Sequence, residues 1–139
     1  MNYVHQSEKI IYWADDDEDD RDLIRDVLHE LEPGCRLVHF YNGQLLLEHL
    51  ENGGDTLQPD LIILDMNMPV LDGRKTLSAL KKQERYKGIP MVIFTTSTSE
   101  LDKKFCEWMH TQMLSKPYSY EALKKVLSKI LLLCLDQGV

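Results

Sequence analysis

Hydrophobic positions along the chain form short unbroken runs, separated by longer segments with helical spacing. Unbroken runs occupy residues 10–14, 61–64 and 90–95. Apolar runs without polar alternation are typical of strands that are buried on both faces of a parallel sheet. Residues 36–41 are a further strand candidate, and residues 112–114 are the weakest one. The chain therefore carries five predicted strands.

Each predicted strand is followed by a predicted helix. Apolar residues recur on one face of the first two helices: Leu23, Ile24, Val27, Leu28 and Leu31 from Arg21 onward, then Leu45, Leu46 and Leu50. Asn42 is expected to cap the second helix, over 44–52. Further helices are expected over 74–86, over 99–110 with Ser99 as its cap, and after Ser119.

The order of these elements is strand and helix in strict alternation, five times over. This order predicts an α/β fold with a mostly parallel sheet, helices on both of its faces and right-handed crossovers. A length of 139 residues suits a single domain with one sizeable core. No internal repeat or linker interrupts the pattern.

The composition excludes several classes of function. The chain has 23 acidic and 16 basic residues, a net charge of −7, which argues against general nucleic-acid binding. The longest apolar run, 130–135, is far too short for a membrane span, and the N-terminus lacks the pattern of a signal peptide. Three widely spaced cysteines match no zinc or redox motif and are expected to be free, buried thiols. These features predict a soluble cytoplasmic protein.

Polar residues stand where the predicted strands end: Asp15 and Asp16 after the first, Asp65 after the third, Thr95 and Thr96 at the fourth, and Lys116 after the fifth. In a parallel sheet built from such units, every strand-to-helix loop opens on the same edge. Ligands of open α/β sheets collect outside this carboxyl edge. We therefore expect the scattered polar residues to converge into one constellation.

Such a constellation has a definite chemistry. Three carboxylates brought together raise one another's pKa unless a cation compensates their charge. Carboxylate oxygens without His or Cys partners suit Mg²⁺ or a similar divalent ion. Asp65 could then act as a nucleophile that forms an aspartyl phosphate. Thr95 and Lys116 would supply a hydrogen-bond donor and a positive charge for the phosphoryl oxygens.

Simpler interpretations exist for each part. Acidic residues at the start of a helix favour its dipole, and this effect accounts for four of them without any site role: Glu18, Asp19, Asp20 and Asp22. Asp65 alone could be a loop residue that caps the next helix. Thr95 alone could be an ordinary strand residue, and Lys116 an ordinary surface lysine. The five histidines show no ligand spacing, and Trp108 is expected to pack rather than to bind a ligand.

Four segments taken together carry a resemblance to a known family: ADDDEDDRDLI after a buried strand, LIILDMNMP, VIFTTS and LSKP. In this order and spacing they resemble the receiver domain of two-component response regulators, over about residues 8–134. The resemblance implies a flavodoxin-like (βα)5 fold, a doubly wound sandwich with a central five-stranded parallel sheet. It also implies that residues 1–139 form a single, stand-alone receiver without an output domain.

The resemblance assigns the chemistry to particular residues. Asp65 would accept a phosphoryl group from a histidine kinase or a histidine phosphotransfer protein. Asp16 and Asp65 would contact Mg²⁺ (or Mn²⁺) directly, Asp15 through water, and the backbone carbonyl of Asn67 would complete the protein ligands. Thr95 would bind the phosphoryl group. Such a protein is a phosphoacceptor with metal-dependent self-phosphorylation and autodephosphorylation rather than a conventional enzyme.

The same resemblance makes Lys116 the second phosphoryl-binding residue and its bond to Pro117 a frequent cis peptide. Asn67 and Thr96 occupy the positions that line access to the phosphorylated residue and tune its lifetime. One residue departs from the family pattern: Met113, which is flexible and has no hydroxyl, stands where members often carry the Tyr or Phe of the usual aromatic switch.

Phosphorylation is still expected to pull Thr95 inward and to shift the surface formed by the fourth helix, the fifth strand and the fifth helix, because phosphate favours the conformer that contacts it. A downstream protein would bind there, or the phosphoryl group would pass along a relay; the sequence does not choose. It also leaves the oligomeric state open.

Three other classes share parts of this pattern. A haloacid-dehalogenase-type phosphatase uses a strand-end Asp with Mg²⁺, but it needs a second Asp where this chain has Asn67. A flavin-binding flavodoxin needs a Ser/Thr/Gly-rich phosphate loop where this chain has residues 15–17, which are all Asp. A receiver that binds partners without being phosphorylated would carry the same fold.

Overall fold

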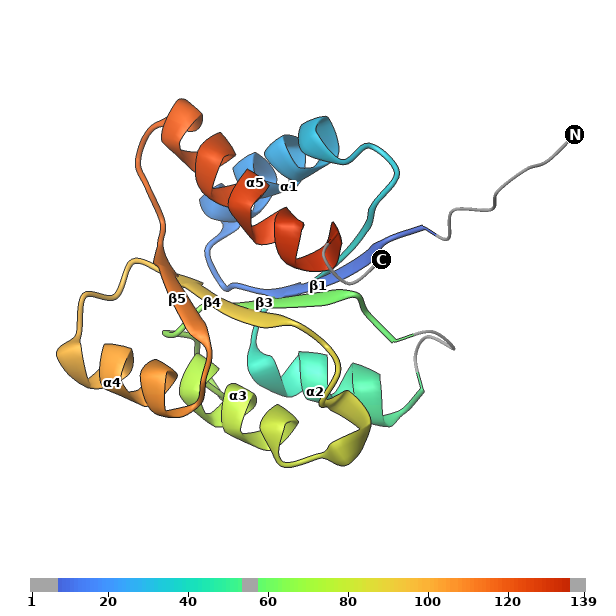
Figure 1. The fold of residues 1–139 in the computed structure, drawn as a ribbon, viewed down its shortest axis with the longest axis vertical. Coiled ribbons are helices and arrows are strands. Elements are labelled where there is room, and N and C mark those ends of the chain that lie inside the picture. The colour runs from blue at the N-terminus through green and yellow to red at the C-terminus, as the bar shows by residue number, and fades with distance from the viewer. Residues whose placement is uncertain (1–7, 54–57, 136–139) are drawn as a thin grey trace, which may run out of the picture.

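The computed structural model describes residues 8–53 and 58–135 (Figure 1). Five parallel strands form one sheet in the order β2-β1-β3-β4-β5. The strands are β1 (Ile10–Ala14), β2 (Arg36–Phe40), β3 (Leu61–Leu64), β4 (Met91–Thr95) and β5 (Gln112–Ser115). The helices are α1 (Glu18–Leu31), α2 (Gly43–Glu51), α3 (Gly73–Lys81), α4 (Glu100–Trp108) and α5 (Tyr120–Leu135), with a short 3₁₀ helix η1 (Glu84–Tyr86). The flavodoxin-like fold expected from the sequence is confirmed.

Helices cover both faces of the sheet. Helices α1 and α5 lie on one face, and α2, α3 and α4 lie on the other (Figure 1). Alternate residues of β1 serve the two sides: Tyr12 and Ala14 belong to the core beneath α2 and α3, whereas Ile11 and Trp13 belong to the core beneath α1 and α5. Because each central strand is buried on both faces, its sequence is an unbroken apolar run.

Side-chain caps fix where the helices begin. Asn42 and Ser99 cap α2 and α4, as the sequence predicts. Helix α1 begins at Glu18, three residues earlier than expected, because the side chain of Asp17 accepts hydrogen bonds from the backbone N–H groups of Asp19 and Asp20. The acidic run therefore contributes both the end of the β1–α1 loop and the first turn of α1.

Two helices end earlier than expected. The predicted helix over 74–86 stops at Lys81, and the chain then turns so that Tyr86 of η1 is buried. Helix α4 stops at Trp108 rather than His110, because His110 adopts a left-handed conformation with φ 54°. A left-handed residue just after the last turn is a common helix end.

Three apolar residues predicted to face the core are exposed instead. Leu23 and Leu45 lie at the edges of the buried stripes of α1 and α2, beside the buried Ile24 and Leu46. Helical residues one position apart differ by about 100° in direction, so a neighbour of a core residue can face water. Trp108, expected to pack, is 78% exposed at the end of α4.

Other expectations concern thiols and membranes. Cys35 and Cys106 are free and buried, as predicted, and the side chain of Cys134 lies outside the described residues. Within the described ranges, the helices are too short or too polar to cross a bilayer.

Candidate functional site

Four polar side chains from four strand ends are buried together at the carboxyl edge of the sheet. Asp15 follows β1, Asp65 follows β3, Thr95 ends β4 and Lys116 follows β5, and each residue as a whole is at most 9% exposed. Burial of charged groups is costly unless they are paired. The convergence expected from the sequence is therefore present, and these residues must compensate one another.

The ammonium group of Lys116 holds this cluster together. Its Nζ donates hydrogen bonds to carboxylate oxygens of Asp15 at 2.7 Å, Asp65 at 2.8 Å and Asp20 at 2.9 Å. An ammonium group has three donors. Each of them has an acceptor in this arrangement, so Lys116 is saturated by carboxylates.

Asp20 is the member of this cluster that the sequence did not reveal. The dipole of α1 explains an acidic residue in its first turn, yet Asp20 also reaches Lys116 across the site. Its place in the first turn of α1, close to the strand end that carries Asp15 and Asp16, is the one available signal. That signal cannot separate Asp20 from its acidic neighbours.

The charges in the site shift the pKa values of its members. Burial raises the pKa of Asp15 to about 6, because its removal from water outweighs the hydrogen bonds from Lys116 and the Asp17 N–H. Burial lowers the pKa of Lys116, but its hydrogen bonds to Asp15, Asp20 and Asp65 outweigh that effect and raise the pKa above its ordinary value. The site thus has more negative charge than its one lysine compensates.

The excess of carboxylates fits a divalent cation. Asp15, Asp16 and Asp65 each place one carboxylate oxygen so that all three oxygens lie within 4.8 Å of one another. Asp15 and Asp65 are buried, whereas Asp16 is exposed and leaves the group open to solvent. Hard oxygen donors of this kind suit Mg²⁺ or Mn²⁺, and a bound cation would favour their ionised forms.

Backbone contacts fix the position of Asp65. Its N–H donates to the carbonyl of Ala14 at 3.0 Å, which extends the pairing of β3 with β1. One carboxylate oxygen accepts the N–H of Met66 at 2.7 Å, and the other faces Lys116. A Cβ atom at Gly73 would lie 2.2 Å from the carbonyl oxygen of Asp65, so only glycine permits this close return of the chain.

Thr95 connects the site to the β4–α4 loop. Its hydroxyl oxygen accepts the N–H of Ser97 at 3.2 Å, and its backbone carbonyl accepts the N–H of Lys116 at 2.9 Å. Thr96 is exposed beside it, and Asn67 is exposed in the β3–α3 loop. Met113 on β5 is half-buried and packs against the core beneath α2 and α3.

Two details differ from the sequence-based expectations. The Lys116–Pro117 bond, for which the resemblance implies a frequent cis peptide, is trans, as are the other peptide bonds in the described part of the chain. Trans is the lower-energy form before proline, and Lys116 reaches the site with it. His39, assigned no role, lies 2.7 Å from the backbone carbonyl of Asp15 through Nε2. Since a carbonyl only accepts, Nε2 carries the proton.

Fold and site together define an α/β protein of the CheY-like receiver class. Residues 11–128 match the response regulator receiver domain family, and the chain belongs to that family. Its members serve as phosphoacceptors in two-component signalling. This membership decides against the haloacid-dehalogenase and flavodoxin alternatives.

Several known proteins are similar to the chain. The probable methanogenesis regulatory protein FilR2 of Methanothrix harundinacea is 37% identical over 99 residues, which cover 68% of this chain and 63% of FilR2. Response regulator Rcp1 of Synechocystis sp. is 33% identical over 97 residues, covering 68% of this chain and 66% of Rcp1. The matches thus span slightly less than two thirds of these relatives.

Two solved structures support the same class. The phosphorylated cyanobacterial phytochrome response regulator RcpA superposes with a TM-score of 0.86 at 26% identity, covering 96% of this chain and 98% of RcpA. The Mn²⁺-bound form of Rcp1 superposes with a TM-score of 0.79 at 29% identity, covering 88% of this chain and 91% of Rcp1. One neighbour is therefore phosphorylated and the other carries a divalent metal.

Proposed function

We propose that this chain is a stand-alone receiver that accepts a phosphoryl group on Asp65 from a histidine kinase or a histidine phosphotransfer protein. The reaction depends on Mg²⁺ and takes place in the cytoplasm. The observation that carries the proposal is the Asp65 carboxylate, buried at the carboxyl edge of the sheet beside one lysine and two further carboxylates.

The transfer needs one bond to form and one to break. A carboxylate oxygen of Asp65 attacks the phosphorus atom, and the bond from phosphorus to the donor breaks. With a phosphohistidine donor the imidazole nitrogen keeps the electron pair, and with acetyl phosphate the acetate oxygen keeps it. Lys116 and Thr95 then bind oxygens of the transferred group, because both can donate hydrogen bonds at the strand ends.

The metal would be held directly by carboxylate oxygens of Asp16 and Asp65 and by the backbone carbonyl of Asn67, and by Asp15 through water. A divalent cation supplies positive charge, which lets an anionic donor approach several carboxylates. Burial of Asp15 and Asp65 excludes water from one side of the cluster, while the exposed Asp16 keeps the other side accessible. Asn67 and Thr96, both exposed beside the site, set how long the phosphoryl group survives.

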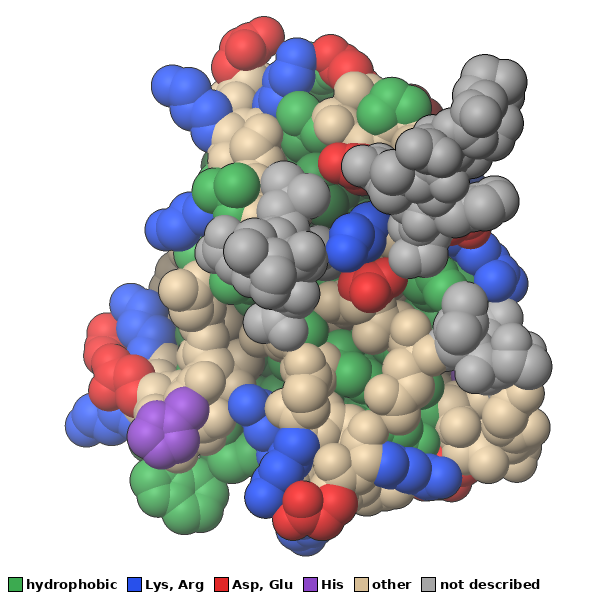
Figure 2. Space-filling view, turned by 45° about the vertical axis from the view of Figure 1, so that its right-hand side comes forward, with side chains coloured by type: hydrophobic (Ala, Val, Ile, Leu, Met, Phe, Trp, Pro, Cys, Tyr) green, Lys and Arg blue, Asp and Glu red, His purple; other side chains and the backbone are tan. Residues whose placement is uncertain are grey.

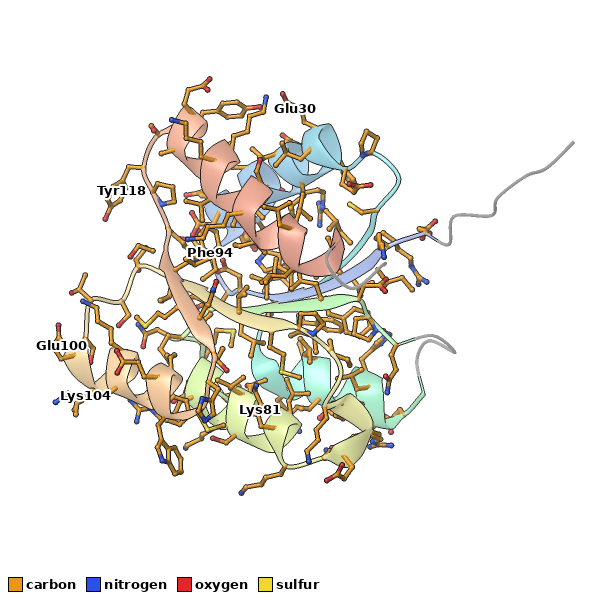
Figure 3. The ribbon with its side chains drawn as sticks, viewed as in Figure 1. Glu30, Lys81, Phe94, Glu100, Lys104 and Tyr118 are labelled. Carbon is orange, nitrogen blue, oxygen red and sulfur yellow. The ribbon has the colours of Figure 1, made fainter. Side chains whose placement is uncertain are left out.

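The phosphorylated form signals through the surface of α4, β5 and α5, or passes its phosphoryl group along a relay. Movement of Thr95 toward a phosphoryl group takes its hydroxyl away from the Ser97 N–H. Leu101 and Trp108 of α4 and Tyr118, which precedes α5, are exposed apolar side chains, and Tyr118 points outward in Figure 3. On the face drawn in Figure 2, which turns the right-hand side of Figure 1 forward, acidic and basic side chains are interspersed.

Intact mass after incubation with Mg²⁺ and acetyl phosphate tests the proposal. The chain should gain one phosphoryl group, and the gain should vanish in Asp65→Ala and after chelation of the metal. Asp26→Ala, which removes an exposed carboxylate of α1, is the matched control and should still gain the group. A folded, metal-loaded chain that gains no mass would instead indicate a receiver that binds partners without phosphorylation.

A further inference from the structure

The three carboxylates that accept hydrogen bonds from Lys116 differ in their exposure. The side chains of Asp15 and Asp65 are 1% and 10% exposed, whereas that of Asp20 is 34% exposed. The loss of a hydrogen-bond donor costs the most free energy for a buried carboxylate, because no water replaces the donor. Asp20 is therefore the acceptor that can exchange Lys116 for water at the lowest cost.

Phosphorylation requires such an exchange. In the described structure each of the three Lys116 donors already has a carboxylate acceptor. A phosphoryl oxygen on Asp65 can be bound by Lys116 only if one of these hydrogen bonds is given up. Asp15 is held in place by its backbone within the β1 edge and accepts the Asp17 N–H as well. Of the two contacts with carboxylates that stay unphosphorylated, the contact with Asp20 is the one that can be released.

We propose that Asp20 is a positioning residue for Lys116. It occupies the third donor of the ammonium group before phosphorylation and competes with the incoming phosphoryl oxygens for it. Asp20 thereby slows phosphorylation and favours the unphosphorylated state. This inference rests on the proposed function of Asp65.

The negative charge of Asp20 and its hydrogen bond with Lys116 both slow phosphorylation. An anionic phosphodonor approaches a site with carboxylates at positions 15, 16, 20 and 65 and one lysine. Removal of the Asp20 carboxylate lowers the repulsion and also frees a Lys116 donor. Asp19 separates the two effects, because it is exposed in the same first turn of α1 and carries the same charge, but Lys116 donates its hydrogen bonds to Asp15, Asp20 and Asp65 instead.

The experiment compares Asp20→Ala with Asp19→Ala in the full chain. Phosphorylation by acetyl phosphate with Mg²⁺ is followed by intact mass, and the loss of the phosphoryl group is followed after the donor is removed. Asp20→Ala should phosphorylate up to about fivefold faster than the native chain without faster loss, whereas Asp19→Ala should change the rate by less than about 1.5-fold. Asp20→Glu, which restores a carboxylate, should return the rate toward the native value.

A second measurement reads Lys116 without any phosphoryl transfer. The ¹⁵Nζ resonance of Lys116 in the metal-free chain should shift in Asp20→Ala and stay unchanged in Asp19→Ala. Asp20→Asn, which keeps the shape of the side chain, repeats the test if the alanine variant does not fold. Equal acceleration in both alanine variants, or an unmoved Lys116 resonance, would overturn the inference. Failure of the native chain to gain a phosphoryl group would contradict the function of Asp65 and leave the resonance test intact.

Discussion

Two networks of charged side chains lie near β4, and they match their charges differently. At the sheet edge, one buried ammonium group of Lys116 faces the carboxylates of Asp15, Asp20 and Asp65. Between α3 and α4, Arg74 pairs with Asp102 at 2.7 Å, and the other carboxylate oxygen of Asp102 accepts the Ser97 hydroxyl at 2.7 Å. The first network is buried with excess negative charge, and the second is half-exposed and balanced.

The difference in charge balance indicates a ligand-binding role for the sheet-edge network and a structural role for the Arg74–Asp102 network. Burial raises the pKa of Asp15, so a further cation at the sheet edge would stabilise the ionised carboxylates. Burial also raises the pKa of Asp102, but the hydrogen bonds from Ser97 and Arg74 outweigh it and lower the pKa overall. Arg74 additionally stacks over Phe105, with its guanidinium carbon 4.7 Å from the ring centre. The second network needs no further partner and fixes α4 against α3.

Replacement of the central lysine should have the largest effect. Lys116→Met leaves two carboxylates buried without their cation and should lower the free energy of unfolding by about 3–5 kcal/mol. Urea denaturation at neutral pH measures the loss, and Mg²⁺ should stabilise the variant more than the native chain because it supplies the missing charge.

Lys104→Met is the control for that change, because Lys104 points into solvent from α4 (Figure 3). It should alter the stability by less than about 0.5 kcal/mol. A loss of under about 1 kcal/mol in Lys116→Met would mean that the buried carboxylates do not depend on this lysine.

The next effect comes from the backbone on which the site is built. In Gly73→Ala the new Cβ would meet the carbonyl oxygen of Asp65 at 2.2 Å, and backbone cannot move aside as a side chain can. We expect a loss of about 2–3 kcal/mol and slower phosphorylation of Asp65, measured by urea denaturation and intact mass. Gly88→Ala, where the added atom meets nothing within 4 Å, should leave both unchanged. Equal behaviour of the two variants would show that the close approach is not required.

Most of the fold could be predicted from the sequence, because strands and helix starts are determined largely by residues close together in the chain. Unbroken apolar runs mark β1, β3 and β4, and side-chain caps such as Asn42 and Ser99 mark helix starts. The order of the elements then brings Asp15, Asp65, Thr95 and Lys116 to one edge. Errors fell at helix ends, where the left-handed His110 depends on chain path rather than on residue type.

What the sequence could not supply are contacts made across the fold. Asp20 and Lys116 are 96 residues apart, and nothing local distinguishes Asp20 from Asp19. Glycine is needed at position 73 because the chain returns there to the backbone of Asp65. The sequence around Gly73 predicts only a turn. Exposure of Trp108 likewise depends on where α4 ends above the sheet. Each of these follows from three-dimensional packing, which periodicity does not encode.

The smallest effect belongs to the balanced network. Asp102→Asn keeps the side-chain shape but removes the charge opposite Arg74, whose side chain is 41% exposed, so the loss at neutral pH should be about 1 kcal/mol or less. Because the pKa of Asp102 is lower in the folded chain, its contribution is present above the unfolded value and is lost as the pH falls through the folded one. The difference between native and variant chains, measured by urea denaturation from pH 7 downward, should therefore shrink below about pH 4. Glu100→Gln, which removes an exposed carboxylate 3.4 Å from Lys103, is the control and should show a smaller difference at neutral pH. A loss in Asp102→Asn as large as that in Lys116→Met would contradict the distinction between the two networks, since an exposed partner would then matter as much as a buried one.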